Sequence, residues 1–156
     1  MPDWWRERTF RHAEAMSGQV WAGGVLLRAG RVLLARRTMH RRLAPGRWDL
    51  PGGHAEADED AATALVRELW EEIGVTVSRS RPLLRVDVPT ADGTADYHIF
   101  LILDWEGEPT NRQPEEHLQI GWFTLDEAMA LDLADARYVA VLRRALSVWR
   151  RSAIGR

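Results

Sequence analysis

The sequence predicts an α/β (α+β) protein in which helices cover a mixed or antiparallel sheet. Two observations support this prediction: strand-like segments rich in Val and Leu lie on both sides of one amphipathic helical segment, and a second helical segment closes the chain. A length of 156 residues suits one domain, and a hydrophobic content of 46% is enough for a core. We assign residues 1–17 to an N-terminal extension and residues 18–156 to the domain itself.

The domain begins with a predicted β-hairpin. Residues 20–27 and 31–37 are rich in Val and Leu, and a short Ala-Gly linker lies between them. A polar, basic loop over residues 40–47 leads to a short predicted strand at residues 48–50. Residues 51–53, Pro-Gly-Gly, have the composition of a turn that closes this strand.

A helix is predicted over residues 59–73. Apolar side chains recur there at spacings of three and four residues, which gives one apolar stripe. Asp58 is the predicted N-cap, and its acidic neighbours lie where the helix dipole favours negative charge. Gly74 follows the last turn, where a left-handed residue commonly ends a helix. The stripe consists of Ala62, Leu65, Val66, Leu69 and Ile73.

The second half of the chain is predicted as strands followed by helices. An Ala-Asp-Gly turn joins two of the strands, and a polar loop over residues 106–118 precedes the last one. The strands are predicted at residues 75–77, 83–88, 97–105 and 119–124, and the helices at residues 125–131 and 135–150.

The composition excludes several classes of function. The chain has no cysteine, which rules out disulfides, thiolate zinc sites and a cysteine nucleophile. Its formal net charge of −2 gives no overall attraction to nucleic acid or anionic membranes, so we expect neither a nucleic-acid polymer nor a membrane as partner. The N-terminus lacks the apolar stretch of a signal peptide, and no apolar run has the length of a membrane helix. We therefore expect a cytoplasmic protein. Both a monomer and a homodimer are compatible with the sequence.

Three glutamates of the central predicted helix are candidate ligands for a divalent cation. Glu68, Glu71 and Glu72 stand at i, i+3 and i+4, so their side chains point into one sector of the helix, beside the apolar stripe. Like charges at these spacings repel by roughly 0.2–0.5 kcal/mol per pair. Hard divalent cations such as Mg²⁺ bind oxygen ligands, which clustered carboxylates supply. A solvated acidic face is the alternative interpretation.

The residues around these glutamates resemble the Nudix box. From Gly53 the chain gives Gly, five residues, Glu59, seven residues, Arg-Glu-Leu, one residue, Glu-Glu, one residue and Gly-Val, which ends the box at Val75. A chance match at one place is on the order of one in a billion. The resemblance implies a Nudix-like α/β/α sandwich, with a mixed sheet flanked by helices. It also implies a hydrolase that cleaves a diphosphate linkage in a nucleoside diphosphate derivative.

The resemblance implies a role for each box residue. The three clustered glutamates would bind one or more Mg²⁺ ions, for which Mn²⁺ would substitute, and the carbonyl of Gly53 would contact metal too. Arg67 would pair with a box carboxylate and orient it, and Glu59 would support the loop and the helix. An ordinary tight turn, a plain surface ion pair and a dipole-favoured acid are the respective alternatives. No organic cofactor is implied.

The sequence offers two candidate positions for the general base, one in the box and one in the acidic loop. Glu68 is one candidate by its position in the box. Glu115 or Glu116 is the other, because similar nucleotide-cleaning members of the family carry an acidic residue near the metals in a comparable loop. We therefore expect both loop acids as metal ligands and Glu116 also as a catalytic residue. A solvent-exposed acidic loop is the alternative.

Contacts to substrate are predicted from residues that precede the box. Some of the arginines at positions 36, 37, 41, 42 and 47 would hold phosphate oxygens, with Arg36 and Arg47 preferred. Trp48 or Trp122 would stack on a base, with Trp48 preferred. Hydrated arginines and a core tryptophan are the alternatives. Three histidines lie in segments expected to line the cleft, but none has metal-ligand spacing with another, so each is expected to be satisfied or exposed. They are His54, His98 and His117.

Among the branches of the family, the chain is most similar to the MutT-type nucleotide pyrophosphohydrolases. Residues 48–54 and the acidic loop with Trp122 beyond it carry this similarity. It implies nucleotide sanitising, in which a (d)NTP becomes a monophosphate and pyrophosphate. The alternatives are an ADP-ribose, nucleotide-sugar or dinucleoside polyphosphate hydrolase, and a non-catalytic ligand-binding regulator, although such regulators typically lose box acids. An isopentenyl diphosphate isomerase shares the fold but relies on a cysteine, which this chain lacks.

Overall fold

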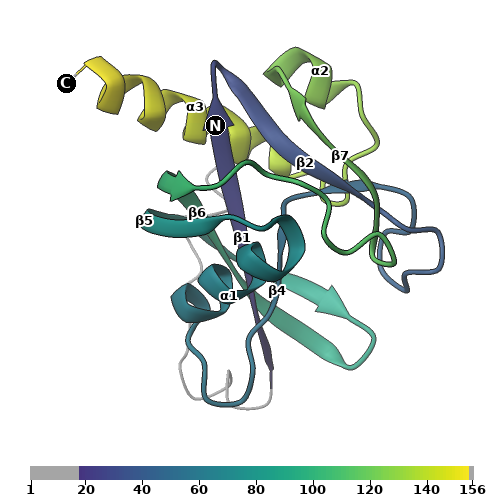
Figure 1. Cartoon of the computed structure of the whole chain (residues 1–156). Helices are drawn as coiled ribbons and strands as arrows, with labels where there is room; N and C mark the ends of the chain where they lie inside the picture. The colour runs from purple at the N-terminus through teal and green to yellow at the C-terminus, as the bar shows by residue number, and fades with distance from the viewer. Residues whose placement is uncertain (1–17, 155–156) are drawn as a thin grey trace.

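The computed structural model describes residues 18–154, so the predicted N-terminal extension lies outside the described residues. The elements in this part of the chain alternate between strands and helices much as the sequence predicts (Figure 1). They are β1 (Gln19–Arg28), β2 (Arg31–Arg37), β3 (Trp48–Asp49), β4 (Gly52–His54), α1 (Ala61–Ile73), β5 (Thr76–Thr90), β6 (Gly93–Glu106), β7 (His117–Phe123), α2 (Leu125–Met129) and α3 (Tyr138–Ile154). None of these helices is long and apolar enough to cross a membrane.

The strands form a mixed sheet with β1 at its centre. The strand order is β3-β2-β1-β6-β5, while β4 pairs with β1 and β7 pairs with β2. The β1–β6 pair is parallel and runs from Gln19↔Ala95 to Leu26↔Ile102, whereas the other pairs are antiparallel. The predicted hairpin of β1 and β2 is present, but only its turn end is paired, at Leu27↔Val32 and Arg28↔Arg31. Beyond that point β4 takes the place of β2 beside β1.

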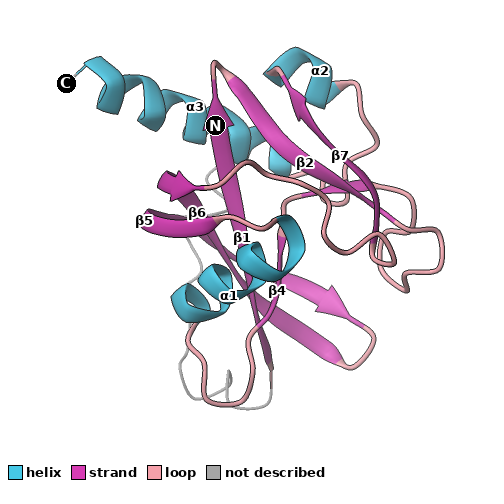
Figure 2. Cartoon of the chain, viewed as in Figure 1, coloured by secondary structure: helices cyan, strands magenta, loops and turns pink. Residues whose placement is uncertain are grey.

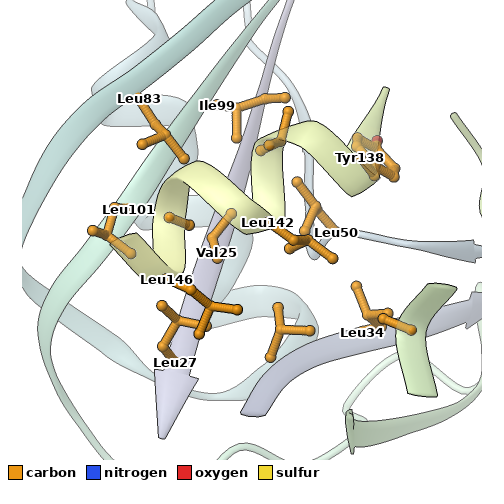
Figure 3. Close-up of a cluster of buried hydrophobic side chains, with 14 of the residues drawn as sticks. Val25, Leu27, Leu34, Leu50, Leu83, Ile99, Leu101, Tyr138, Leu142 and Leu146 are labelled. Atoms are coloured by element: carbon orange, nitrogen blue, oxygen red, sulfur yellow. The ribbon is translucent and has the colours of Figure 1, made fainter. Parts of the chain in front are cut away.

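The helices lie on opposite faces of this sheet, which confirms the predicted α/β/α sandwich. Side chains of β1 alternate between the two faces, as strand geometry requires. Val25 and Leu27 belong to the apolar cluster that contains Leu142 and Leu146 of α3 (Figure 3). Leu26 belongs to a second apolar cluster, which includes the buried side of α1. A central strand buried on both faces explains why its sequence is almost continuously apolar.

Helix α1 has the predicted end but not the predicted start. Gly74 adopts the left-handed conformation with φ 72°, and its N–H donates to the carbonyl of Trp70. The N-cap is Asp60, whose side chain accepts a hydrogen bond from the Thr63 N–H at 2.8 Å. The prediction of Asp58 as the cap is therefore wrong. Because Asp60 closes the first turn, the helix begins at Ala61.

The structure also differs from one turn prediction and one pair of strand predictions. Residues 51–53 were expected to form a turn, but Gly52 and Gly53 belong to β4 and pair with Gly23 and Ala22 of β1. A side chain at Gly52 would lie 2.0 Å from the carbonyl oxygen of Ala22, so the two backbones approach too closely for any other residue. The expected strands at 75–77 and 83–88 form one long irregular strand, β5, at the edge of the sheet, where Pro82 is tolerated.

The loop after β2 and the loop before β7 meet at one end of the sheet (Figure 2). The Thr38 N–H donates to the carbonyl of Glu116 at 3.1 Å, and Arg37 pairs with His117. Strand β7 begins two residues earlier than predicted, so His117 belongs to the sheet. The loop before β7 also binds the end of α1, because the Arg112 N–H donates to the carbonyl of Glu72. These contacts bring the acidic loop to the helix that carries the three glutamates.

Candidate active site

The innermost acid of the cluster is Glu72 on α1. Glu72 is only 3% exposed, and one of its carboxylate oxygens accepts a hydrogen bond from the Gly52 N–H of β4 at 3.0 Å. Burial is the main cause that raises the pKa of Glu72 well above its ordinary value, and the nearby carboxylates of Glu68, Glu116 and Asp49 raise it further. The side chain is thus a carboxylate held away from water among other acids.

Glu68 lies one turn earlier, against the backbone of β4. A Cβ atom placed on Gly53 would lie 2.4 Å from the carboxyl carbon of Glu68. The glycine is therefore required because the carboxylate occupies the space of a side chain. Burial also raises the pKa of Glu68, with Arg67 acting in the opposite direction.

Arg67 connects the helix to the loop before it. Its guanidinium binds Glu59 through two hydrogen bonds of 2.8 Å, and this pair lowers the pKa of Glu59 to about 2. The same group contacts Glu68 at 3.0 Å and Glu71 at 3.1 Å, and it donates to the carbonyl of His54 at 2.9 Å. Glu71 is the outermost of the three glutamates, with a side chain that is 42% exposed.

The loop before β7 brings one of its two acids to the cluster. Glu72, Glu116 and His117 each offer one oxygen or nitrogen atom, and these three atoms lie within 4.8 Å of one another. Glu116 also forms an ion pair with Arg41 at 3.3 Å. Glu115 is exposed and lies outside this group, so among the described residues the loop contributes Glu116 rather than Glu115.

His117 belongs to this arrangement, which its sequence context did not predict. The residue is 6% exposed, and its Nδ1 atom has no hydrogen-bond partner among the described residues. The expectation of a satisfied or exposed histidine is therefore wrong at this position. The available signal was its place directly after Glu116. By contrast, His54 is exposed and stacks on Trp21, and His98 contacts Asp96 at 3.1 Å.

Comparison with known proteins decides the family. A model of the NUDIX domain matches residues 19–145. This chain belongs to the NUDIX family. The Nudix hydrolase is 36% identical over 135 residues to a protein of Mycobacterium tuberculosis that is provisionally named 8-oxo-dGTP diphosphatase 2, with 85% of this chain and 93% of that protein covered. It is 31% identical over 112 residues to the CTP pyrophosphohydrolase of Escherichia coli, with 72% and 80% covered.

Solved structures agree with this assignment. The crystal structure of a MutT NUDIX hydrolase from Burkholderia pseudomallei matches the Nudix hydrolase with a TM-score of 0.72 and 31% identity. The match covers 81% of this chain and 97% of that chain. The predicted Nudix fold and the predicted likeness to MutT-type enzymes are thus confirmed. The chain is an enzyme of the pyrophosphohydrolase class.

The donor set of this Nudix hydrolase fits a divalent cation. Glu68, Glu72 and Glu116 offer carboxylate oxygens, which are the ligands that hard cations prefer. The space that a side chain at Gly53 would fill is kept open for the carboxylate of Glu68. Burial raises the pKa of both Glu68 and Glu72, and a bound cation would offset the cost of burying their negative charge.

The three residues predicted to contact substrate have partners elsewhere in the Nudix hydrolase. Arg36 donates to the carbonyl of Gly46 at 3.0 Å, and Arg47 lies 3.6 Å from Asp132 on the surface. Trp48 is 8% exposed and packs edge-on against Phe123 at 4.9 Å, so its ring lies in the core. This burial argues against base stacking by Trp48.

Among the arginines that precede the box, Arg41 forms an ion pair with an acid of the cluster, whereas Arg36 and Arg47 were the preferred substrate contacts. Arg41 contacts Glu116, and its positive charge also acts on His54 and His117. Five arginines occur between residues 36 and 47, and their spacing alone does not separate those that face the acids from those that face solvent.

Proposed function

We propose that this Nudix hydrolase converts a (deoxy)nucleoside triphosphate to a monophosphate and pyrophosphate, with Mg²⁺ as its metal. The observation that carries the proposal is the buried carboxylate of Glu72 beside Glu68 and Glu116. The names of similar proteins support the substrate class. They include the CTP pyrophosphohydrolase of Escherichia coli and an 8-oxo-dGTP diphosphatase of Proteus vulgaris, which is 33% identical over 92 residues.

We assign the metal ligands to Glu68, Glu72 and Glu116, with Glu71 on the outer side, and the resemblance to the box adds the carbonyl of Gly53 as a further proposed ligand. A bound divalent cation neutralises charge on the diphosphate oxygens and makes water more acidic. The guanidinium of Arg67 holds Glu68 and Glu71 in position through hydrogen bonds near 3 Å. These contacts fix the carboxylates before substrate arrives, which favours a site that needs little rearrangement.

For the general base we favour Glu68 over Glu116. Burial raises the pKa of Glu68, and a raised pKa makes a carboxylate a better proton acceptor near neutral pH. Glu116 forms an ion pair with Arg41 at 3.3 Å, which holds its carboxylate in place and suits a metal ligand. In this assignment Glu68 accepts the proton of the water that attacks phosphorus.

The test is hydrolysis of a substrate panel with Mg²⁺, followed by identification of the products. The panel contains normal and oxidised nucleoside triphosphates, ADP-ribose and dinucleoside polyphosphates. Release of pyrophosphate from a triphosphate supports the proposal, and cleavage of only the other compounds contradicts it. Binding of a nucleotide without any turnover would favour a regulator instead.

Glu72→Gln tests the metal assignment in the same assay. The substitution keeps the shape of the side chain but removes its charge, and we expect kcat to fall by at least about 100-fold. Glu115→Gln is the matched control, because it makes the same change at an exposed glutamate that lies outside the acid cluster. Undiminished activity of Glu72→Gln would show that the metal assignment is wrong.

A further inference from the structure

The imidazole ring of His117 is buried with one nitrogen atom that the described residues do not bind. The residue begins β7 and is almost completely buried, yet its Nδ1 atom has no hydrogen-bond partner in the described part of the chain. Buried polar atoms in folded proteins nearly always have a partner. An orphaned ring nitrogen therefore points to a ligand that the protein atoms do not supply.

The ring lies beside two carboxylates that belong to different elements. A nitrogen of His117 and oxygens of Glu72 and Glu116 lie within 4.8 Å of one another. Glu72 comes from α1, Glu116 from the end of the loop, and His117 from the first position of β7. One ion in contact with all three side chains would connect the helix, the loop and the sheet.

The backbone of His117 is fixed on both sides. Its N–H donates to the carbonyl of Gln113 at 3.0 Å, and its own carbonyl accepts a hydrogen bond from the Asn111 side chain at 2.8 Å. Its register partner in β2 is Arg37. Because the backbone is held in this way and the ring itself is buried, His117 has little freedom to turn away from the carboxylates, which suits a preorganised ligand.

The charges around the ring are mixed. Glu116 and Asp49 bring negative charge toward His117, and Arg37 and Arg41 bring positive charge. Arg41 is paired with Glu116 at 3.3 Å, and Arg37 is paired with Asp49 at 3.0 Å. Within residues 18–154, the buried carboxylate of Glu72 is bound by the Gly52 N–H and by no arginine. Negative charge near His117 is thus left for a cation to balance.

We propose that His117 is a nitrogen ligand that completes, with Glu72 and Glu116, a mixed carboxylate–imidazole position for a divalent ion. The inference rests on the proposed function, because the two glutamates belong to the proposed metal centre. Mg²⁺ prefers oxygen ligands, whereas an imidazole ligand favours divalent transition ions. This position therefore raises the affinity for ions such as Mn²⁺ and Co²⁺ relative to Mg²⁺.

The direct test is pulsed electron paramagnetic resonance of Mn²⁺ bound to the full chain without nucleotide. We expect nitrogen coupling from a coordinated imidazole in the native protein, its loss in His117→Asn, and its retention in the control His98→Asn. His98 lies on β6 and contacts Asp96, outside the proposed position. Mn²⁺ that binds the native protein without nitrogen coupling, or coupling that persists in His117→Asn, would overturn the inference.

Affinities give a second measurement. The dissociation constants of Co²⁺ and Mg²⁺ are measured by titration of the metal-free protein. We expect His117→Asn to weaken Co²⁺ binding by at least about tenfold and to change Mg²⁺ binding by less than about threefold. Equal changes for the two ions would contradict a nitrogen ligand. Thermal unfolding of the metal-free variants shows whether the substitution preserves the fold.

These measurements separate the inference from the proposed function. Both use the metal ion alone, so they do not depend on turnover of any nucleotide. Hydrolysis of triphosphates together with all-oxygen coordination of Mn²⁺ would overturn only the role of His117. Nitrogen coupling in a protein that hydrolyses no nucleotide would overturn only the proposed function.

Discussion

At the scale of single residues, the contact between Gly53 and Glu68 fixes the position of one carboxylate. A side chain at Gly53 would overlap the carboxyl group of Glu68, with only 2.4 Å between the added Cβ atom and the carboxyl carbon. The helix and the strand are both held by the core, so the carboxylate is the group that would have to move. Displacement of a catalytic group by about 1 Å can cost about 100-fold in rate.

Gly53→Ala is therefore expected to lower kcat/KM by about 10- to 100-fold while the protein stays folded. The measurement is steady-state hydrolysis of the best triphosphate substrate. Gly30→Ala is the control, because no atom of the described residues lies within 4 Å of a Cβ added there and Gly30 lies in the turn between β1 and β2. Gly30→Ala should strain the backbone at φ 73° without a comparable loss of activity. Equal losses in both variants would show that the effect is on the fold rather than on Glu68.

A second residue-scale prediction concerns the pair of Glu59 and Arg67. This pair lowers the pKa of Glu59 in the folded protein from 4.5 to about 2. A lowered pKa means that the unfolded chain binds the proton more tightly. The pair therefore adds stability above about pH 4.5, and this contribution is lost as the pH falls toward about 2.

Glu59→Gln should remove this pH dependence. Urea unfolding at several pH values should show that the difference in unfolding free energy between the native protein and Glu59→Gln shrinks as the pH falls from about 5 to about 2. Glu115→Gln is the control at an exposed acid, and its difference should change less. A difference for Glu59→Gln that stays constant over this range would contradict the assigned pair.

The sequence allowed the box residues to be selected, but it did not allow the rest of the cluster to be chosen. Helical spacing places Glu68 and Glu72 on one side of a helix, and this is a local property. The choice of Glu116 over Glu115, and the burial of His117, depend on how a distant loop binds the end of α1. No spacing within the sequence encodes that contact.

At the scale of elements, α1 belongs to the core and to the proposed site at once. Leu69 is fully buried against β1, where its side chain lies near Gly24, and it stands between Glu68 and Glu72 in the sequence. The packing of Leu69 therefore fixes the depth at which the glutamates lie. Helix residues on the other side, such as Val66, are exposed.

Leu69→Ala should lower the unfolding free energy by about 2–5 kcal/mol, because it leaves a cavity between α1 and the sheet. Val66→Ala is the control on the same helix and should change the unfolding free energy by only about 0.5 kcal/mol. Urea unfolding of both variants makes the comparison. Similar losses in the two variants would contradict the assignment of the buried face.

The same scale shows what local patterns predict and what they miss. The helical spacing and Gly74 predict α1 and its end correctly, because both signals act within one helix. The predicted apolar stripe is wrong at Ala62 and Val66, which are exposed, whereas its other three residues are buried. Asp58 fails as the cap because Asp60 is an equally good residue type two positions closer to the helix. The Pro-Gly-Gly segment has turn composition, but pairing with β1 places its glycines in β4. Tertiary contacts decided each of these cases.

At the scale of the whole molecule, the layers follow from the sequence pattern, but the strand neighbours do not. The apolar segments on either side of one helix predict helices packed on a sheet, and the structure has this architecture. The pairing of β1 with β6 joins distant parts of the chain, so no turn signal in the sequence predicts it. The sequence therefore predicts the kind of fold more fully than it predicts the order of strands.

The parallel pairing of β1 with β6 has a consequence for folding of the nascent chain during synthesis on the ribosome. Strand β1 begins at Gln19, but its partners in β6 extend from Ala95 to Ile102. During synthesis the most apolar strand of the chain therefore leaves the ribosome long before the strand that protects its backbone. Pairings between distant residues also form slowly, because a long loop must close before they gain any contact. A nascent chain of this protein must thus keep an aggregation-prone strand covered until more than half of its residues have been made.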